Sequence, residues 1–187
     1  MSKWEDGLRR LFKATPSKDI HGTIINVMKG TADDRSAALT SGALADTGLM
    51  AGIVAILRPP GPKDVDALFW TEKAKYRTFN LRIKQASALG LIGPQTKRNL
   101  TVIREIRNVF AHALIEVTFN TPEIVAACNE IALSTNAQFL ADRESERRTR
   151  YRFCYGCDAV FRGLLGWASL TLIFGIPASK PPNPILP

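Results

Sequence analysis

Apolar residues recur every three or four positions along most of this chain, which is the spacing of helices that pack one face against a core. The clearest case is the stretch 100–112, where the apolar stripe consists of Leu100, Ile103, Ile106 and Phe110. We therefore predict a helix there, with its polar residues on the opposite side.

The same spacing predicts further helices, and glycine or proline interrupts the pattern between most of them. Their expected ranges are 2–14, 31–56, 64–70, 71–91, 121–133 and 136–174. Residues 20–28 are apolar but too few to distinguish a helix from a strand, and no convincing sheet is predicted. The expected fold is all-α, a single-domain helical bundle of about six helices.

The bundle is expected to span residues 31–176, after an N-terminal helix and connector (1–30) and before a proline-rich tail (177–187). A length of 187 residues suits one domain, and 45% hydrophobic with 22% charged residues is typical of a soluble globular protein. Residues 160–176 are apolar, but a membrane span needs about 20 such residues. We expect this run to be buried in the core and expect no membrane partner.

Small residues are unusually frequent in the predicted helix 31–56, which we expect to begin with Thr31 as its N-cap and acids in its first turn. They are Ala37, Ala38, Ser41, Gly42, Ala45, Gly48 and Gly52. Such residues allow helices to approach closely. Packing within the core is the preferred interpretation, and a self-association surface is the alternative.

Three cysteines are too few for a disulfide scaffold and odd in number, and no secretory signal pattern precedes them. A cytoplasmic location is therefore expected. Cys154 and Cys157 are spaced as in metal or redox sites, but neither histidine is nearby in the sequence and no βαβ pattern surrounds them. We interpret them as small buried apolar residues and expect no metal and no cofactor.

The net charge of +8 is concentrated in one part of the chain. Residues 72–107 contain nine basic and two acidic residues, a local charge of +7. Eight of these basic residues are candidates for nucleic-acid binding: Lys73, Lys75, Arg77, Arg82, Lys84, Lys97, Arg98 and Arg104. They either attract a phosphate-rich partner such as RNA, by charge neutralisation and counterion release, or simply keep helix faces soluble.

Arg107, Asn108 and His112 are the polar residues of the 100–112 helix whose chemistry suggests a catalytic site. Asn108 and His112 share a face, while Arg107 lies about 140° around the axis from His112 and has a long side chain. An imidazole titrates near neutral pH and suits acid or base catalysis, and a guanidinium stabilises phosphate charge. The structural alternatives are a histidine that caps the helix end and an Arg107 that pairs with Asp46.

The middle of the chain, residues 31–133, resembles the mannitol operon repressor family. The matching segments are 34–39, 68–69, 88–92, 103–112, 118–119 and 123–133. The resemblance implies a regulatory or binding role that needs no helix-turn-helix and no direct contact with DNA. It also makes a regulatory protein partner conceivable.

The segment from Arg107 to His112 is also similar to the Arg-x4-His signature of the HEPN superfamily of small helical bundles. In that superfamily, an arginine, a following polar residue and a histidine form the site of metal-independent endoribonucleases. The resemblance assigns those roles to Arg107, Asn108 and His112. Because His21 has no supporting neighbours, such a site would need a second copy of the chain, so a homodimer is part of this hypothesis.

Two functions therefore remain open from the sequence. The first is a cytoplasmic, self-associating regulatory protein of the mannitol-repressor type, and the second is a HEPN-type ribonuclease acting as a toxin or defence component. A purely structural interaction module is a third reading, with the helix 31–56 as its interface. Both active readings expect Arg107 and His112 to face one positively charged, water-accessible crevice.

Overall fold

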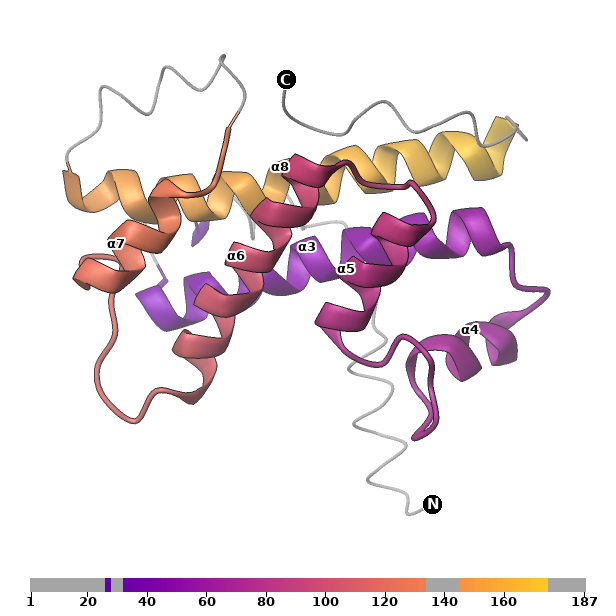
Figure 1. Ribbon diagram of the computed structural model, residues 1–187, viewed down its shortest axis with the longest axis horizontal. Coiled ribbons are helices and arrows are strands. Elements are labelled where there is room, and N and C mark those ends of the chain that lie inside the picture. Colours follow the sequence, from indigo (N-terminus) through magenta and orange to yellow (C-terminus); the bar gives the residue numbers. More distant parts are fainter. Residues whose placement is uncertain (1–25, 28–31, 134–144, 175–187) are drawn as a thin grey trace.

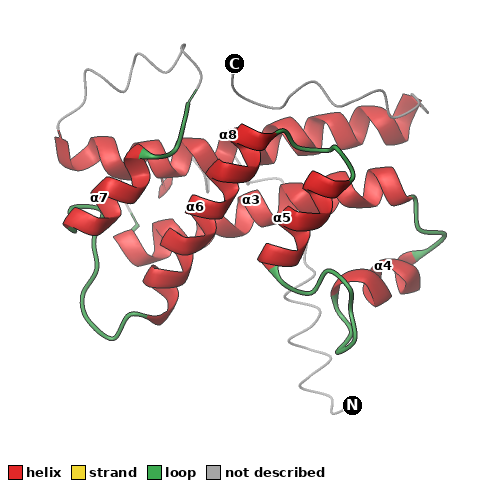
Figure 2. Cartoon of the chain, viewed as in Figure 1, coloured by secondary structure: helices red, strands yellow, loops and turns green. Residues whose placement is uncertain are grey.

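The described part of the chain consists of six helices without a strand, so the all-α prediction is confirmed. The computed structural model describes residues 26–27, 32–133 and 145–174 (Figures 1 and 2). Its helices are α3 (Asp34–Leu57), α4 (Pro62–Phe69), α5 (Phe79–Ala88), α6 (Pro94–His112), α7 (Pro122–Asn129) and α8 (Ser145–Phe174). The helix predicted over 2–14, His21 and the tail 177–187 lie outside the described residues.

Helices α3 and α8 run side by side along the length of the molecule and in the same direction (Figure 1). Their backbones nearly touch, because a Cβ atom built on Gly48 would lie only 2.9 Å from the Cα atom of Phe161. The small residues predicted to allow close approach are all buried in the bundle, with Gly48 against α8 and Gly42 against α6. They pack within the chain, which agrees with the preferred interpretation.

The remaining core lies where α5, α6 and α7 cover this pair of helices. Three phenylalanine rings connect the layers, with centroids 5.0 Å apart for Phe110 and Phe119 and 5.5 Å apart for Phe119 and Phe153. The stripe predicted on the 100–112 helix faces inward, since its residues are at most 2% exposed. This packing leaves the opposite face of α6 to solvent.

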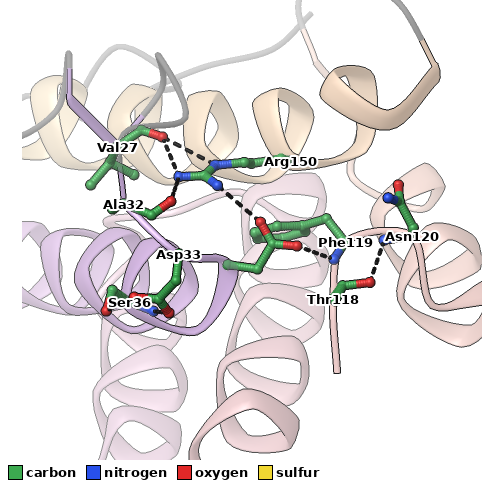
Figure 3. Close-up of polar contacts among 9 residues, drawn as sticks. Val27, Ala32, Asp33, Ser36, Thr118, Phe119, Asn120 and Arg150 are labelled. Atoms are coloured by element: carbon green, nitrogen blue, oxygen red, sulfur yellow. Dashed lines mark hydrogen bonds and ion pairs between the residues drawn. The ribbon is translucent and has the colours of Figure 1, made fainter. Parts of the chain in front are cut away.

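The N-cap of α3 is Asp33, so the prediction of Thr31 as the cap was wrong. An Asp33 side-chain oxygen accepts the backbone N–H of Ser36 at 2.9 Å, and the Ser36 hydroxyl donates to the same carboxylate at 2.6 Å (Figure 3). These hydrogen bonds lower the pKa of Asp33. A carboxylate at this position also interacts favourably with the helix dipole.

Arg150 of α8 holds the start of α3 in place (Figure 3). Its guanidinium donates to the carbonyl of Val27 at 3.0 Å, to the carbonyl of Ala32 at 2.6 Å and to Oδ1 of Asp34 at 2.9 Å. The other oxygen of Asp34 accepts the backbone N–H of Phe119 at 2.8 Å. One half-buried ion pair therefore joins α8, α3 and the loop that follows α6.

The helix predicted over 71–91 is shorter than expected, since α5 begins only at Phe79. Thr78 ends the preceding turns and caps α5, its hydroxyl accepting the backbone N–H of Leu81 at 3.3 Å. The side chain of Tyr76 is buried as a helical pattern would require, but its backbone N–H donates to Leu68 across a turn, at 2.9 Å. At the other end, Gly90 adopts a φ of +69°, which favours glycine.

Among the described helices, α3 is the one long and apolar enough to cross a membrane by length and composition. Half of the most apolar stretch of α3 is buried inside the bundle, as expected for the central helix of a folded domain. The described part of the apolar run at residues 160–176 is partly packed into the core, as expected, with Leu164 and Trp167 buried.

Candidate functional site

Arg107 lies where α6 crosses α3, with its aliphatic stem against Gly42. A Cβ atom on Gly42 would lie 2.8 Å from Cγ of Arg107, so only a glycine leaves room for this side chain. The guanidinium donates from Nη1 to Oδ1 of Asn108 at 3.3 Å. The stem is therefore fixed by packing, and the charged end lies at the side chain of the next residue.

Asn108 and His112 continue from Arg107 around α6. Asn108 is half-buried, and His112 is exposed in the last turn, on the same side as the exposed Thr101, Glu105 and Val109. Arg107 lies at the edge of the buried face, about 140° from His112 on a regular helix. Arg107 and Asn108 are therefore joined by a hydrogen bond, and Asn108 shares a face with His112. The guanidinium of Arg107 and the imidazole of His112, however, lie on different sides of α6.

The end of α6 is capped by an arginine that the sequence did not assign to the site. Arg35, in the first turn of α3, donates from Nη2 to the carbonyl of Ala113 at 2.8 Å. This bond uses the carbonyl that directly follows His112. His112 has no hydrogen bond to any described residue, so its imidazole does not cap the carbonyls at the end of α6 there.

Asp46 lies on α3, one turn after Gly42, where it interacts with Arg82 of α5 and with the charge of Arg107 of α6. Arg82 of α5 forms an ion pair with Oδ2 of Asp46, whereas Oδ1 is buried without a hydrogen-bond partner in the described part of the chain. Burial raises the pKa of Asp46, and the charges of Arg82 and Arg107 partly oppose that rise. Arg107 therefore acts on Asp46 through its charge, but the described structure contains no ion pair between the two side chains.

The assignment of Arg82 to a nucleic-acid-binding surface is corrected by the structure, because Arg82 is only 4% exposed. Besides Asp46, its guanidinium donates to the carbonyl of Tyr76 at 2.9 Å and of Arg77 at 3.1 Å, and it lies over the rings of Phe69 and Trp70. These contacts of Arg82 hold the turns before α5 in place. A side chain with this many internal partners does not reach a ligand.

The other seven predicted basic residues divide into two groups. Arg77, Arg98 and Arg104 are engaged within the chain: Arg77 with the carbonyl of Glu72 at 3.2 Å, Arg98 with Glu130 at 2.5 Å, and Arg104 with Asn80 and Glu105. The four lysines, in contrast, are exposed and form no ion pair with any described residue. They are Lys73, Lys75, Lys84 and Lys97.

The three cysteines are buried and free, which confirms their interpretation as small core residues. Burial raises the pKa of Cys128 to about 12 and that of Cys154 to about 11, and it raises the pKa of Cys157 as well. All three thiols are therefore neutral at physiological pH and weak nucleophiles. Among the described residues, no group of three metal-binding side chains converges.

The chain matches no model of a known family, no curated protein and no solved structure in comparisons with each. A functional proposal therefore depends on the residues just described. They are the four exposed lysines in the turns before α5, on α5 and in the first turn of α6, which form no ion pair with a described residue, and the polar residues Arg107, Asn108 and His112 of α6.

Proposed function

We propose that this protein is a regulatory binding protein of the mannitol-repressor type, which binds the phosphate backbone of RNA through the lysines around α5 and α6. The observation that carries the proposal is the division of the basic residues in the 72–107 segment. Arginines are engaged by internal partners there, while Lys73, Lys75, Lys84 and Lys97 are exposed and without ion-pair partners in the described chain.

Exposed ammonium groups without a carboxylate partner retain their full charge for an external ligand. Each one that meets a phosphate releases condensed counterions, which makes affinity fall as salt rises. At physiological ionic strength, charges act over roughly 8 Å. Two lysines in the turns before α5, one on α5 and one in the first turn of α6 together favour a partner that carries several negative charges over one with a single charge.

The regulatory part of the proposal comes from the resemblance of residues 31–133 to the mannitol operon repressor family. That resemblance implies a regulatory or binding role that needs no helix-turn-helix. Binding of an RNA, or of a regulatory protein partner, fits such a role without direct contact with DNA.

The experiment is a binding titration of a fluorescein-labelled single-stranded RNA, followed by anisotropy. The double variant Lys84→Glu/Lys97→Glu is expected to bind at least tenfold more weakly than the wild type, because two attractive charges become repulsive. Lys63→Glu is the control, since Lys63 is also an exposed lysine and lies in the first turn of another helix, α4. Equal affinity of the double variant and the wild type would contradict the proposal.

A HEPN-type ribonuclease is the second candidate, supported by the hydrogen bond between Arg107 and Asn108 and by the imidazole of His112, which is exposed and has no hydrogen bond to any described residue. In this mechanism, His112 removes the proton of a ribose 2′-hydroxyl, which then attacks the adjacent phosphorus and forms the 2′,3′-cyclic phosphate. Arg107 stabilises the charge on the phosphorane oxygens. The leaving 5′-oxygen takes a proton from an acid, which a second copy of the chain would supply.

Cleavage of RNA in the presence of EDTA tests this second candidate. His112→Ala and Arg107→Lys are each expected to lower the cleavage rate at least 100-fold, while Thr101→Ala, at an exposed and uncharged position on the same side of α6 as His112, leaves it unchanged. If wild-type protein binds RNA and leaves it intact at every concentration, binding without chemistry is the function that remains.

A further inference from the structure

The turns between α4 and α5, residues 71–78, expose their basic side chains and bury the residues between them. The exposed basic residues are Lys73, Lys75 and Arg77. Ala74 and Tyr76, which alternate with them, are each only 8% exposed. Two residues of chain span at most about 7 Å, so neighbouring members of this row have their Cα atoms within that distance. We call this segment, with its closely spaced cations, the lysine loop.

Hydrogen bonds to the backbone keep the lysine loop in shape. The N–H of Tyr76 donates to the carbonyl of Leu68 at 2.9 Å, and the Arg77 guanidinium donates to the carbonyl of Glu72 at 3.2 Å. A carbonyl carries no net charge, so this contact leaves the charge of Arg77 available. The carboxylate of Glu72 forms no ion pair with a described residue. With three basic residues and one acid, the loop has a net charge of +2.

Arg82 supports this loop from inside the protein. Its guanidinium donates to the carbonyl of Tyr76 at 2.9 Å and to that of Arg77 at 3.1 Å, the two residues that follow Lys75. The same guanidinium forms an ion pair with Asp46, so the loop is connected to α3. Several donors in one planar group can reach these acceptors together, which a single ammonium cannot do.

The other two exposed lysines need no such support. Lys84 lies on α5 and Lys97 in the first turn of α6, where helical hydrogen bonds fix the backbone. The positions of Lys73 and Lys75 depend instead on the contacts of their loop. A loop that already has its binding shape loses less conformational freedom when a ligand binds, which raises affinity.

We propose that Arg82 is a positioning residue for RNA binding, which holds Lys73, Lys75 and Arg77 in a row that contacts neighbouring phosphates of one RNA strand. Arg82 itself touches no RNA. The inference rests on the proposed function for the identity of the ligand. It deepens that function by adding Arg77 to the contacts and by making the order of the lysine loop a determinant of affinity.

The first test is a double-mutant cycle in the RNA titration, with Arg82→Lys as the second background. Lysine keeps a positive charge beside Asp46 but cannot donate to both carbonyls at once. In otherwise wild-type protein, Lys73→Gln/Lys75→Gln should weaken RNA binding about tenfold and reduce the slope of log affinity against log salt by about 1.4. In the Arg82→Lys background, the same pair should cost about threefold or less, because the lysines are no longer held in place.

Lys84→Gln/Lys97→Gln is the matched control, since its lysines lie on helices. It should lower affinity by the same factor in both backgrounds. If Lys73→Gln/Lys75→Gln also costs the same in both, Arg82 does not position these lysines, and the proposal is wrong while RNA binding stands. If Arg82→Lys reduces the effect of both pairs alike, it acts through general stability, which also overturns the proposal. Absence of RNA binding by the wild type would overturn the proposed function as well.

A second variant loosens the lysine loop without touching Arg82 or any charge. Ala74→Gly adds backbone freedom between Lys73 and Lys75, and it should weaken RNA binding about threefold. Ala126→Gly, the same substitution at an exposed position of α7, should leave the affinity unchanged. Wild-type affinity in Ala74→Gly would mean that binding does not use the order of the loop, contrary to the proposal.

Hydrogen exchange followed by NMR tests the role of Arg82 without RNA. The amide of Tyr76, bonded to Leu68, should exchange at least tenfold faster in Arg82→Lys than in the wild type. The amide of Ala113, bonded to Val109 at 2.9 Å at the end of α6, should keep its rate. Equal exchange of the Tyr76 amide in the two proteins would show that the loop does not depend on Arg82 and would overturn the proposal.

Discussion

Gly42 of α3 and Arg107 of α6 are in direct contact, with no room for another side chain between them. A Cβ atom on Gly42 would lie 2.8 Å from Cγ and 3.1 Å from Cβ of Arg107. The contact involves the root of the arginine side chain, which cannot swing away as its far end could. The distance between α3 and α6, and with it the position of Arg107, thus depends on a glycine in the middle of a helix.

Gly42→Ala is therefore expected to destabilise the protein, although alanine is the better helix former. The gain in helix propensity is about 1 kcal/mol, and overpacking of a tight contact costs about 1–3 kcal/mol, so the free energy of unfolding should fall by ~1 kcal/mol. Urea unfolding measures the change. Gly166→Ala on α8 is the control, because nothing lies within 4 Å of its Cβ position, and it should stabilise the protein.

Replacement of Arg150 tests the ion pair that joins α8 to the start of α3. Arg150→Ala leaves the Asp34 carboxylate and the carbonyls of Val27 and Ala32 without this donor, and Arg150 is only 13% exposed. We expect a loss of about 3 kcal/mol in the free energy of unfolding. Arg98→Ala, which removes an ion pair between two exposed side chains, should change it by less than about 1 kcal/mol. Similar losses for both variants would contradict this role of Arg150.

Asp46 should titrate above the ordinary aspartate range, because burial outweighs the neighbouring guanidinium charges. Its pKa should rise further in Arg107→Gln, since the charge of Arg107 lowers it in the wild type. Carbon-13 NMR of the side-chain carboxyl measures both values. An unchanged pKa in Arg107→Gln would mean that the guanidinium points away from Asp46 in solution.

The same pKa shift determines how stability depends on pH. A carboxyl whose pKa is higher in the folded than in the unfolded protein binds protons more tightly when folded. Its contribution to the free energy of unfolding is therefore largest below the unfolded value of 3.8, falls as the pH rises towards the folded pKa, and is constant above it. The difference in stability between the wild type and Asp46→Asn should follow this curve, and a difference that rises with pH would contradict it.

Several features of the fold were predictable because the signal is local or periodic. The inward stripe from Leu100 to Phe110, the packing of small residues on α3 and the burial of the cysteines all depend on spacing or side-chain size. The turns before α5 were not predictable in this way. Tyr76 and Phe79 have helical spacing, and the first is buried and the second partly buried, but Thr78 offers an N-cap between them, and the cap determines where the helix starts.

The candidate site was predictable in part. Arg107 and Asn108 are hydrogen-bonded neighbours on α6, as their spacing allows, but the expectation that Arg107 and His112 face one crevice is not met, because they lie on different sides of the helix. The burial of Arg82 could not be predicted, because its partner Asp46 lies 36 residues away on another helix. Arg35 is separated from Ala113 by 78 residues, and no pattern in the sequence indicates that pairing. Long-range partners decide which basic residues remain available to a ligand.

The accessibility of the thiols gives a further test of the packing between α7 and α8. A thiol reagent such as 5,5′-dithiobis(2-nitrobenzoic acid) should react with native protein only very slowly at neutral pH, because all three cysteines are buried and neutral. Addition of denaturant should release all three thiols. Rapid reaction of one thiol in the native protein would mean that α7 separates from α8.

The salt dependence of RNA binding by the wild-type protein is the measurement on which the proposed function most directly depends. Affinity for a single-stranded RNA is measured by anisotropy from about 50 to 200 mM salt, a range over which phosphate contacts are strongly weakened. If the four exposed lysines contact phosphates, log affinity should fall linearly with log salt, with a slope of about −3. No binding at low salt, or an affinity that does not change with salt, would contradict the proposal.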